Sequence, residues 1–314
     1  MLSWNIYHGG REFAPNNLEN LLDQVAEIRP DVFFSVETYG SGKQIERDLS
    51  RRSGKGTYTG IQITSRPAGD DNLWLFTRYP VTKVYPKPSG GVTTDFNFGG
   101  ARVLLPNGRQ VNLFTIWLPY TDPWDGYLVD ENAAAIRSGL QPRHSAQDVA
   151  YAERKQTEVL TDVVQRQLPA MLAGNTDPVL IGGDFNTLPA ADWAPEWSKC
   201  RNHFGMNYPF TATTTLIFAK GDVRTEQSRI VDQRMRRHGP GCLLLRPRCR
   251  GQPADHPTAQ VAARATTNPR GPPGNTCPAG RAPLSVWTRS LRFRVSVGRP
   301  MALARDITRL TLTL

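Results

Sequence analysis

The sequence of 314 residues lacks long apolar runs and is poor in cysteine. No stretch approaches the 18 or more apolar residues typical of a membrane-spanning helix, so we expect no membrane span. The first residues, Met1 to Asn5, lack the basic flank and apolar stretch of a secretion signal. Four cysteines are too few for a disulfide framework and have no C-x-x-C spacing for zinc. The chain is therefore expected to be soluble, and its cysteines leave the redox compartment open.

Lysine is absent after Lys220, and positive charge is unevenly distributed along the chain. The net charge is +10, but residues 1–220 hold 21 Lys and Arg against 23 Asp and Glu, a balance of −2. Residues 221–314 hold 17 against 5, a balance of +12, and every one of these cations is arginine. The composition thus changes near residue 220. A nucleic-acid-binding function inferred from net charge would depend on the C-terminal part alone.

The N-terminal part has the pattern of a β-α-β unit. Residues 2–6 alternate like a strand, and the Gly9-Gly10 pair ends it. Asn16 or Asn17 can cap a helix whose apolar residues recur at helical spacing until Pro30. Residues 32–36 are an apolar run, which predicts a strand buried on both faces.

The remaining pattern alternates short strands with one long helix. Apolar or alternating runs predict strands at 58–63, 73–76, 81–85, 101–105, 111–117 and 179–181. The runs at 101–105 and 111–117 are joined by a Pro-Asn-Gly turn and predict a hairpin. Residues 145–172 predict a helix that Pro169 should end or kink. This order indicates an α/β (α+β) fold with mixed sheets covered by helices.

Polar residues stand at the ends of three apolar strands: Asn5, Glu37, and Asp184 with Asn186. Strand ends from distant parts of a chain can converge at one rim of a sheet, where ligands of α/β proteins usually bind. Glu37 offers the hard oxygen that Mg²⁺ prefers, and Asp184 can orient or deprotonate water. The amide of Asn186 can donate to a phosphoryl group, and Asn5 would orient Glu37 or the scissile phosphate.

Each of these residues also has a structural interpretation. A glutamate after a strand is commonly a solvated loop residue. The Gly-Asp-Phe-Asn segment at 183–186 can be a turn in which Asp and Asn bond to their own backbone. The joint order of the motifs favours the catalytic interpretation.

Four segments resemble motifs of the endonuclease/exonuclease/phosphatase superfamily, the DNase I-like metal-dependent phosphoesterases. They are Ser3-Trp4-Asn5-Ile6, Arg29-Pro30-Asp31-Val32 leading to Val36-Glu37, Leu75-Phe76-Thr77-Arg78-Tyr79-Pro80-Val81, and Ile181-Gly182-Gly183-Asp184-Phe185-Asn186. They occur in the order of the family, and the last is the most specific. The resemblance implies a four-layer sandwich of two mixed β-sheets face to face, flanked by helices, and dependence on Mg²⁺ or Mn²⁺.

The chain departs from the family pattern in its later motifs. Where the family usually carries Thr-His-Leu, whose histidine contacts the phosphate, this chain has Ile116-Trp117-Leu118. Trp117 cannot accept a proton, and the nearby Tyr120 favours a packing role for it, although Tyr120 has the alternative of contacting substrate. The closing Arg-Ile-Asp and Ser-Asp-His triplets of the family are missing, and residues 213–218 predict only the strand of that region.

We interpret residues 1–241 as one domain, incomplete at its C-terminal end, and 242–314 as an irregular Arg/Pro-rich tail. The missing Ser-Asp-His triplet can be recovered in a shifted reading frame. One DNA sequence that encodes residues 242–252, when translated one base later, gives Ser-Asp-His followed by residues that predict a strand. Our hypothesis is a frame shift near Gly241, which resequencing of the coding DNA tests. The in-frame pair Asp255-His256 is a rival for the closing motif, although its surroundings lack an apolar strand to position it.

Two further features of the sequence have structural interpretations. Residues 284–297 alternate like a basic hairpin that docks on a sheet or contacts phosphate. We prefer accidental patterning in out-of-frame translation. Four histidines stand alone and are expected to be surface or structural residues, with His8 also able to line the site: His8, His144, His203 and His238.

The function predicted from these patterns is Mg²⁺-dependent hydrolysis of a phosphodiester or phosphomonoester by metal-activated water, in a monomer. Nucleic acid, phospholipid and inositol phosphate all stay open as substrates, because specificity lies in loops that motifs do not describe. The alternatives are a catalytically impaired homologue that acts as a binding module and a basic nucleic-acid-binding protein. Met1 stands directly in the first strand, so we expect the true start upstream, where a secretion signal would have been lost.

Overall fold

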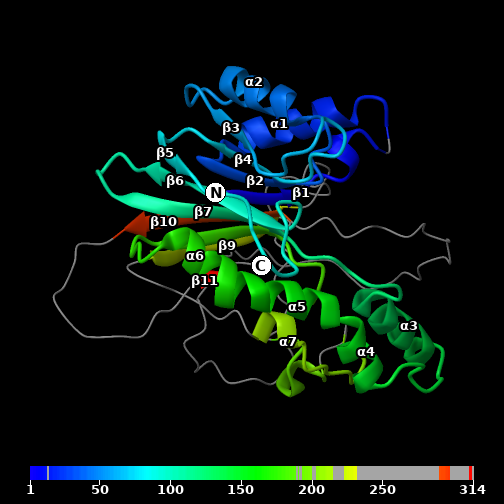
Figure 1. The fold of residues 1–314 in the computed structure, drawn as a ribbon. Coiled ribbons are helices and arrows are strands. Elements are labelled where there is room, and N and C mark those ends of the chain that lie inside the picture. The colour runs from blue at the N-terminus through cyan, green and yellow to red at the C-terminus, as the bar shows by residue number, and fades with distance from the viewer. Residues whose placement is uncertain are drawn as a thin grey trace.

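Two β-sheets lie face to face between outer helices (Figure 1). The computed structural model describes residues 1–12, 14–188, 190, 193–199 and 203–214, together with the backbone of three strands at 223–231, 290–297 and 311–312. Parallel and antiparallel pairs occur in both sheets. The predicted α/β class and the two mixed sheets are therefore confirmed.

The first sheet has the strand order β3-β4-β2-β1-β10-β9. Its strands are β1 (Leu2–Asn5), β2 (Val32–Val36), β3 (Thr59–Gln62), β4 (Trp74–Thr77), β9 (Val223–Val231) and β10 (Ser290–Val297). The central pair, β1 and β2, is parallel, as a β-α-β unit requires. Every residue of β2 is buried, as its continuous apolar run predicts.

The second sheet has the strand order β11-β8-β7-β6-β5. Its strands are β5 (Val81–Val84), β6 (Phe98–Leu104), β7 (Gln110–Trp117), β8 (Val179–Asp184) and β11 (Thr311–Leu312). The predicted hairpin is confirmed in β6 and β7, which pair antiparallel. β8 returns parallel to β7 after a helical crossover, so their carboxyl ends share one edge of the sheet.

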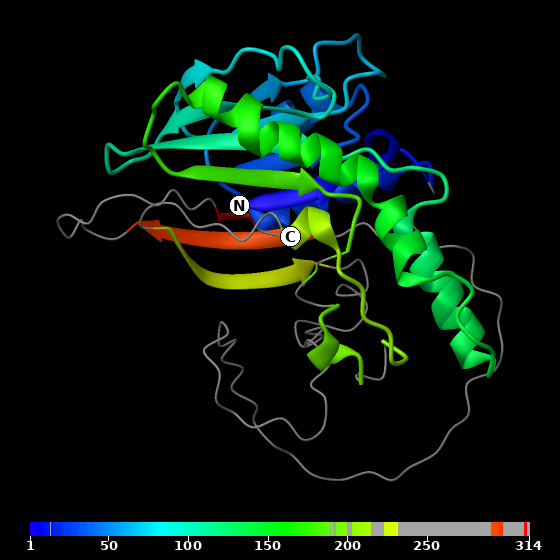
Figure 2. The same cartoon turned by 60° about the horizontal axis from the view of Figure 1, so that its bottom comes forward.

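Helices cover the outer faces of both sheets. The described helices are α1 (Asn17–Ile28), α2 (Gly42–Arg52), α3 (Asp125–Arg137), α4 (Ala146–Ala152), α5 (Arg154–Asp162), α6 (Leu168–Leu172) and α7 (Thr211–Thr214), with 3₁₀ turns η1 (His8–Gly10) and η4 (Pro195–Trp197) and a π-helical segment η2 (Val163–Gln167) between α5 and α6. α1 and α2 lie on the first sheet, and α5 and α6 lie on the second (Figure 1). α3 and α4 extend beyond one end of the sheets (Figure 2).

Three apolar clusters separate the four layers. One lies between α1 and α2 and the first sheet, around Leu22, Ile45 and Phe33. A second fills the space between the sheets, around Phe34 and Leu113. The third packs α5, η2 and α6 on the second sheet, and its members include Phe98, Phe114, Leu160 and Val163. Removal of this apolar surface from water is the main stabilising contribution to the sandwich.

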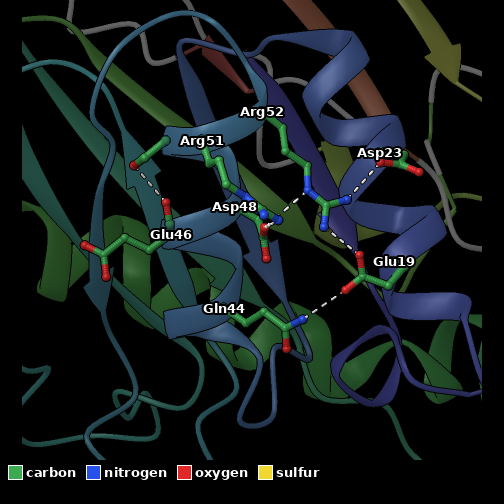
Figure 3. Close-up of polar contacts among 8 residues, drawn as sticks. Glu19, Asp23, Gln44, Glu46, Asp48, Arg51 and Arg52 are labelled. Atoms are coloured by element: carbon green, nitrogen blue, oxygen red, sulfur yellow. Dashed lines mark hydrogen bonds and ion pairs between the residues drawn. The ribbon is translucent and has the colours of Figure 1, made fainter.

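An ionic cluster joins α1 to α2 at the surface of the first layer (Figure 3). The guanidinium of Arg52 lies 2.5 Å from Glu19, 2.8 Å from Asp23 and 3.2 Å from Asp48. The sequence patterns did not predict α2, because its buried apolar side chains are limited to Ile45 and Leu49. The packing of Ile45 and Leu49 against α1 and the sheet, together with the ion pairs of Arg52, stabilises this helix.

The structure corrects the prediction for residues 145–172. These residues form α4, α5, η2 and α6 rather than one helix, although Ser145 does begin α4 with a capping box. Pro169 lies in the first turn of α6 and the helix continues to Leu172. The residues just before it, Val163–Gln167, form a π-helical turn, so the backbone is helical on both sides of Pro169 and the irregularity of the helix precedes the proline.

Two predictions for the C-terminal part are also corrected. Thr213 and Thr214 end α7 instead of beginning a strand, and residues 215–218 lie outside the described residues. Residues 290–297 form β10 between β1 and β9, the sheet docking that we judged less favourable than accidental patterning. The domain boundary at 241 stays a prediction. The pair Asp255-His256, His238 and the four cysteines lie outside the described part of the chain.

Among the described residues, no helix is long and apolar enough to cross a membrane.

Candidate active site

Asn5 and Glu37 emerge together at one edge of the first sheet. β1 and β2 run parallel, and Asn5 lies opposite Val36, so Glu37 follows one residue later at the same carboxyl edge. The side-chain amide of Asn5 donates from Nδ2 to Oε1 of Glu37 at 2.7 Å. The predicted pairing of these two residues is thus present in the structure.

Asp184 reaches the same place from the second sheet. A glycine at 182 allows the close approach, because a Cβ there would lie 2.4 Å from Cδ2 of the Phe34 ring in β2. The hydroxyl of Ser3 donates to the carbonyl of Gly183 at 3.3 Å across the two sheets. These contacts place the end of β8 beside the ends of β1 and β2.

One amide nitrogen joins the carboxylates of the two sheets. Nδ2 of Asn5 donates to Oδ2 of Asp184 at 2.9 Å as well as to Glu37. Oδ1 of Asn5 accepts the backbone N–H of Tyr7 at 3.0 Å, which fixes the orientation of the amide. Asn5 therefore holds two carboxylates that are 147 positions apart in the sequence within reach of the same atom.

The electrostatics of this cluster favour a bound cation. The described partners of both carboxylates are amide and backbone N–H groups, which carry no net charge. Burial raises the pKa of Asp184, and hydrogen bonds from Asn5 and Asn186 partly oppose the rise. No cage of three or more His, Cys, Asp and Glu side chains occurs among the described residues. Two carboxylates fit Mg²⁺ or Mn²⁺, since Mg²⁺ commonly keeps several waters and takes few protein ligands.

Asn186 is held in a strained turn directly after Asp184. Its backbone N–H donates to Oδ1 of Asp184 at 2.9 Å, and its φ is 46°. Nδ2 of Asn186 donates one hydrogen to the carbonyl of Leu118 at 2.7 Å. The carbonyl of Asn186 accepts from Nε1 of Trp124 at 2.6 Å and Nε2 of Gln156 at 2.9 Å. The structural interpretation of this segment as a turn is therefore correct for Asp184, which bonds to the backbone of the turn, whereas the side chain of Asn186 bonds to Leu118 instead.

Strained backbone is concentrated around the cluster. Eight non-glycine residues in the described part of the chain have positive φ, and five of them lie in the loops at these strand ends: Tyr7, His8, Glu37, Tyr39 and Asn186. Such conformations are unfavourable for residues with a Cβ and persist where surrounding contacts determine them, commonly at functional sites.

Two residues that the sequence patterns did not predict, Asn72 and Asp71, fix the loop of Glu37 from behind. Oδ1 of the fully buried Asn72 accepts the backbone N–H of Glu37 at 2.9 Å, and its Nδ2 donates to the carbonyl of Phe96. The preceding Asp71 accepts backbone N–H groups of Gly40 and Gly69. The only signal for them is a polar run directly before a buried strand, which is too common to identify a site.

Aromatic side chains surround the cluster. Burial and the charge of Glu37 raise the pKa of Tyr39 to about 12, and the same two causes raise the pKa of Tyr120. The side chain of Tyr120 is 57% exposed. Trp117 lies opposite Asp184 in the sheet and packs edge-on against Phe96 and Tyr120, which confirms its packing role.

The histidines divide as the sequence predicts. His8 lies beside the cluster, because its backbone N–H contacts Oε2 of Glu37 at 3.4 Å, while its ring pairs with Glu12 at 3.5 Å. His144 pairs with Glu131 at the surface, and His203 stacks on Trp193. His8 is the residue of these three that contacts the site.

Two facing mixed sheets with polar residues at adjoining strand ends are the architecture expected of DNase I-like hydrolases. The chain belongs to the endonuclease/exonuclease/phosphatase family, whose model matches residues 2–281. The match continues beyond residue 241. Members of this family are nucleases and phosphatases, so the chain is a member of a hydrolase family. No curated protein sequence matches it at a significant level.

Solved structures of low sequence identity resemble the chain. The human Nocturnin catalytic domain with bound sulfate anion is 16% identical, with 64% of this chain and 70% of that chain covered and a TM-score of 0.37. Beta toxin from Staphylococcus aureus is 15% identical, with 62% and 67% covered and a TM-score of 0.39. An AP endonuclease from Archaeoglobus fulgidus is 14% identical, with 70% and 72% covered and a TM-score of 0.39.

Replacement of Asn5 by alanine tests the central hydrogen bonds. Asn5→Ala should lower the free energy of unfolding by about 1–3 kcal/mol, because two partly buried carboxylates lose their shared donor. Urea denaturation measures this change. The matched control is Asn20→Ala on the exposed face of α1, which should change stability by less than about 0.5 kcal/mol. Equal stability of Asn5→Ala and the parent would contradict the bridging role.

Proposed function

We propose that this chain hydrolyses a phosphodiester or phosphomonoester with bound Mg²⁺ or Mn²⁺. The observation that supports this proposal is the Asn5 amide, which contacts Glu37 and Asp184 at 2.7 and 2.9 Å from two different sheets. Such uncompensated carboxylates beside strained loops are unfavourable without a ligand that uses them. Their position at the carboxyl ends of strands is also where α/β proteins bind substrates.

The roles follow from the chemistry of each group. Glu37 holds the cation, and Asn5 orients Glu37. The cation, when bound, polarises a phosphoryl oxygen and offsets its negative charge. Asp184 orients a water molecule and accepts its proton, and the raised pKa of this carboxyl makes it a better base once ionised. Asn186 donates its second Nδ2 hydrogen to the phosphoryl group as charge develops there.

A second candidate is an impaired homologue that binds a phosphoester without hydrolysing it. Trp117 favours this candidate, because the family usually has a histidine at this position beside the phosphate and an indole cannot accept a proton. The closing Arg-Ile-Asp and Ser-Asp-His triplets are also missing from the sequence. The nucleic-acid-binding alternative depends on arginine side chains outside the described part of the chain.

The substrate that we propose carries a flat group next to the phosphoester. The charges of Glu37 and Asp184 contribute to the raised pKa of Tyr120, and more than half of this residue's surface is exposed. The centroid of its ring lies 6.4 Å from that of Trp124, and the centroid of the Trp124 ring lies 5.2 Å from that of Tyr127. Aromatic rings at the edge of a polar site stack favourably on bases or aryl groups.

Replacement of either carboxylate should abolish hydrolysis of bis-p-nitrophenyl phosphate in the presence of Mg²⁺ or Mn²⁺. Glu37→Ala and Asp184→Ala should each lower kcat/KM by roughly 10²–10⁴, because they remove the metal ligand and the base. The control is Glu158→Ala, which removes an exposed carboxylate paired with Lys155 and should leave kcat/KM within about twofold.

The outcomes separate the two candidates. Metal-dependent turnover that both substitutions abolish supports the hydrolase. Binding of the substrate without turnover supports the impaired homologue. Turnover that survives in both variants would contradict the assignment of the site.

Removal of the Tyr120 ring should weaken binding of aryl substrates. Tyr120→Ala should raise KM for bis-p-nitrophenyl phosphate about tenfold with little change in kcat, because the lost contact lies outside the reacting group. Tyr151→Ala on α4 removes a ring of similar exposure, 67%, whose described ring contact is with Arg154, and should not change KM. An unchanged KM in Tyr120→Ala would contradict the proposed contact.

A further inference from the structure

Two carboxyl groups are completely buried on the far side of the Asn186 turn. Asp125 is the first residue of α3, Glu153 lies between α4 and α5, and both have 0% exposed surface. Their described partners are hydroxyl, amide and backbone N–H groups, none of which carries a positive charge. A buried pair of like charges without a cation is highly unfavourable, so the pair retains a proton.

The contacts of Thr187 with the two carboxyl groups show which hydrogen bond that proton makes. Oγ1 of Thr187 lies 2.9 Å from Oδ2 of Asp125 and 2.8 Å from Oε1 of Glu153. A hydroxyl has one hydrogen and can donate to only one of these oxygens. The other contact is a hydrogen bond only if the carboxyl itself supplies the hydrogen. Both contacts are therefore satisfied when the two carboxyl groups share one proton.

The proton belongs on Asp125. Glu153 accepts the backbone N–H groups of Thr211 at 2.7 Å and Ala212 at 3.1 Å, which stabilise its ionised form. Asp125 accepts from Nε2 of Gln156 at a longer 3.2 Å. Burial raises the pKa of Asp125 to about 7, and the charge of Glu153 adds to the rise. Burial also raises the pKa of Glu153, against several hydrogen bonds that lower it.

The same network holds Asn186 from behind. Thr187 directly follows Asn186 in the chain. Gln156 uses Nε2 to bridge Oδ1 of Asp125 and the carbonyl of Asn186, at 3.2 and 2.9 Å. Trp124, the residue before Asp125, donates to that same carbonyl at 2.6 Å. Three contacts thus link the buried carboxyl pair to a turn whose φ of 46° requires support.

We propose that Asp125 is a positioning residue: its protonated carboxyl donates to Oγ1 of Thr187, which donates to Glu153, and this chain holds the Asn186 turn in place. This inference rests on the proposed function insofar as Asn186 acts on substrate. The proton stays on the pair and no bond to carbon or phosphorus changes. When Asp125 loses its proton, Thr187 satisfies one carboxylate only and two charges repel each other behind the turn.

The stability of the Asn186 turn should therefore depend on pH. The groups that face Asp125 are Thr187 after β8, Glu153 and Gln156 from the α4–α5 junction, and the N–H groups that begin α3. Glu153 is the titratable member of this set. Because the native state holds a proton that the unfolded chain releases near pH 4, the stability from this proton is complete at low pH and is lost as pH rises through about 7.

Urea denaturation across the pH range tests the shared proton without any substrate. The variant is Asp125→Asn, whose amide donates to Thr187 at every pH and does not titrate. The midpoint of the parent should fall relative to that of Asp125→Asn as pH rises from about 5 to about 8. Glu158→Gln, an exposed change on α5 whose partner is Lys155, should follow the parent. Parallel curves for the parent and Asp125→Asn would overturn the inference.

Hydrogen exchange of residues 184–188 tests the positioning role. At about pH 8 this segment should exchange roughly tenfold faster in the parent than in Asp125→Asn, and at about pH 6 the two should agree. Thr187→Val should exchange fast at both pH values, whereas Thr187→Ser should behave as the parent. Equal exchange in Thr187→Val and the parent at about pH 6 would overturn the inference even if Asp125→Asn fails to fold.

A kinetic measurement connects the pair to catalysis. With bis-p-nitrophenyl phosphate, kcat of the parent should decline as pH rises above about 7, by up to tenfold per pH unit, and Asp125→Asn should lack this decline. The same decline in both proteins would overturn the link to Asn186. Absence of any turnover would contradict the proposed function alone, because denaturation and exchange report on the pair independently.

Discussion

The two hydrogen bonds donated by the Asn5 amide are the interaction on which the site depends. They bring the carboxylate of Glu37, from the first sheet, and that of Asp184, from the second, to one nitrogen. Two carboxylates that contact the same nitrogen repel each other, and burial strengthens the repulsion. The amide offsets part of it, and Gly182 lets the sheets approach closely enough for both bonds to form. The close packing of the two sheets therefore also brings the carboxylates of the site together.

Buried polar side chains give this geometry its rigidity. Asn72 fixes the backbone of Glu37, and Gln156 and Thr187 support the turn of Asn186. Each of these side chains has more than one described partner, so each limits the movement of a strained loop. Positive φ at Glu37 and Asn186 is maintained by these contacts rather than by glycine.

The residues of the site could be predicted from sequence because they stand at the ends of apolar strands. Asn5, Glu37 and Asp184 follow runs whose burial is evident from composition, and the structure brings them together. Asn72 and Asp125 could not be found in this way, since their roles arise from partners 35 and 31 positions away. The helix α2 was missed for a different reason: Ile45 and Leu49 are its only aliphatic side chains, too few to predict a helix from the sequence.

The response of unfolding to Mg²⁺ tests most directly whether the two sheets form one cation site. A ligand that binds only the native state raises the urea midpoint. We expect Mg²⁺ to raise the urea midpoint of the parent. Glu37→Gln should abolish this rise, and Asp184→Asn should reduce it, because the negative charge of Asp184 on the second sheet contributes to binding. A rise that Glu37→Gln leaves intact, or that Asp184→Asn does not reduce, would contradict a shared site.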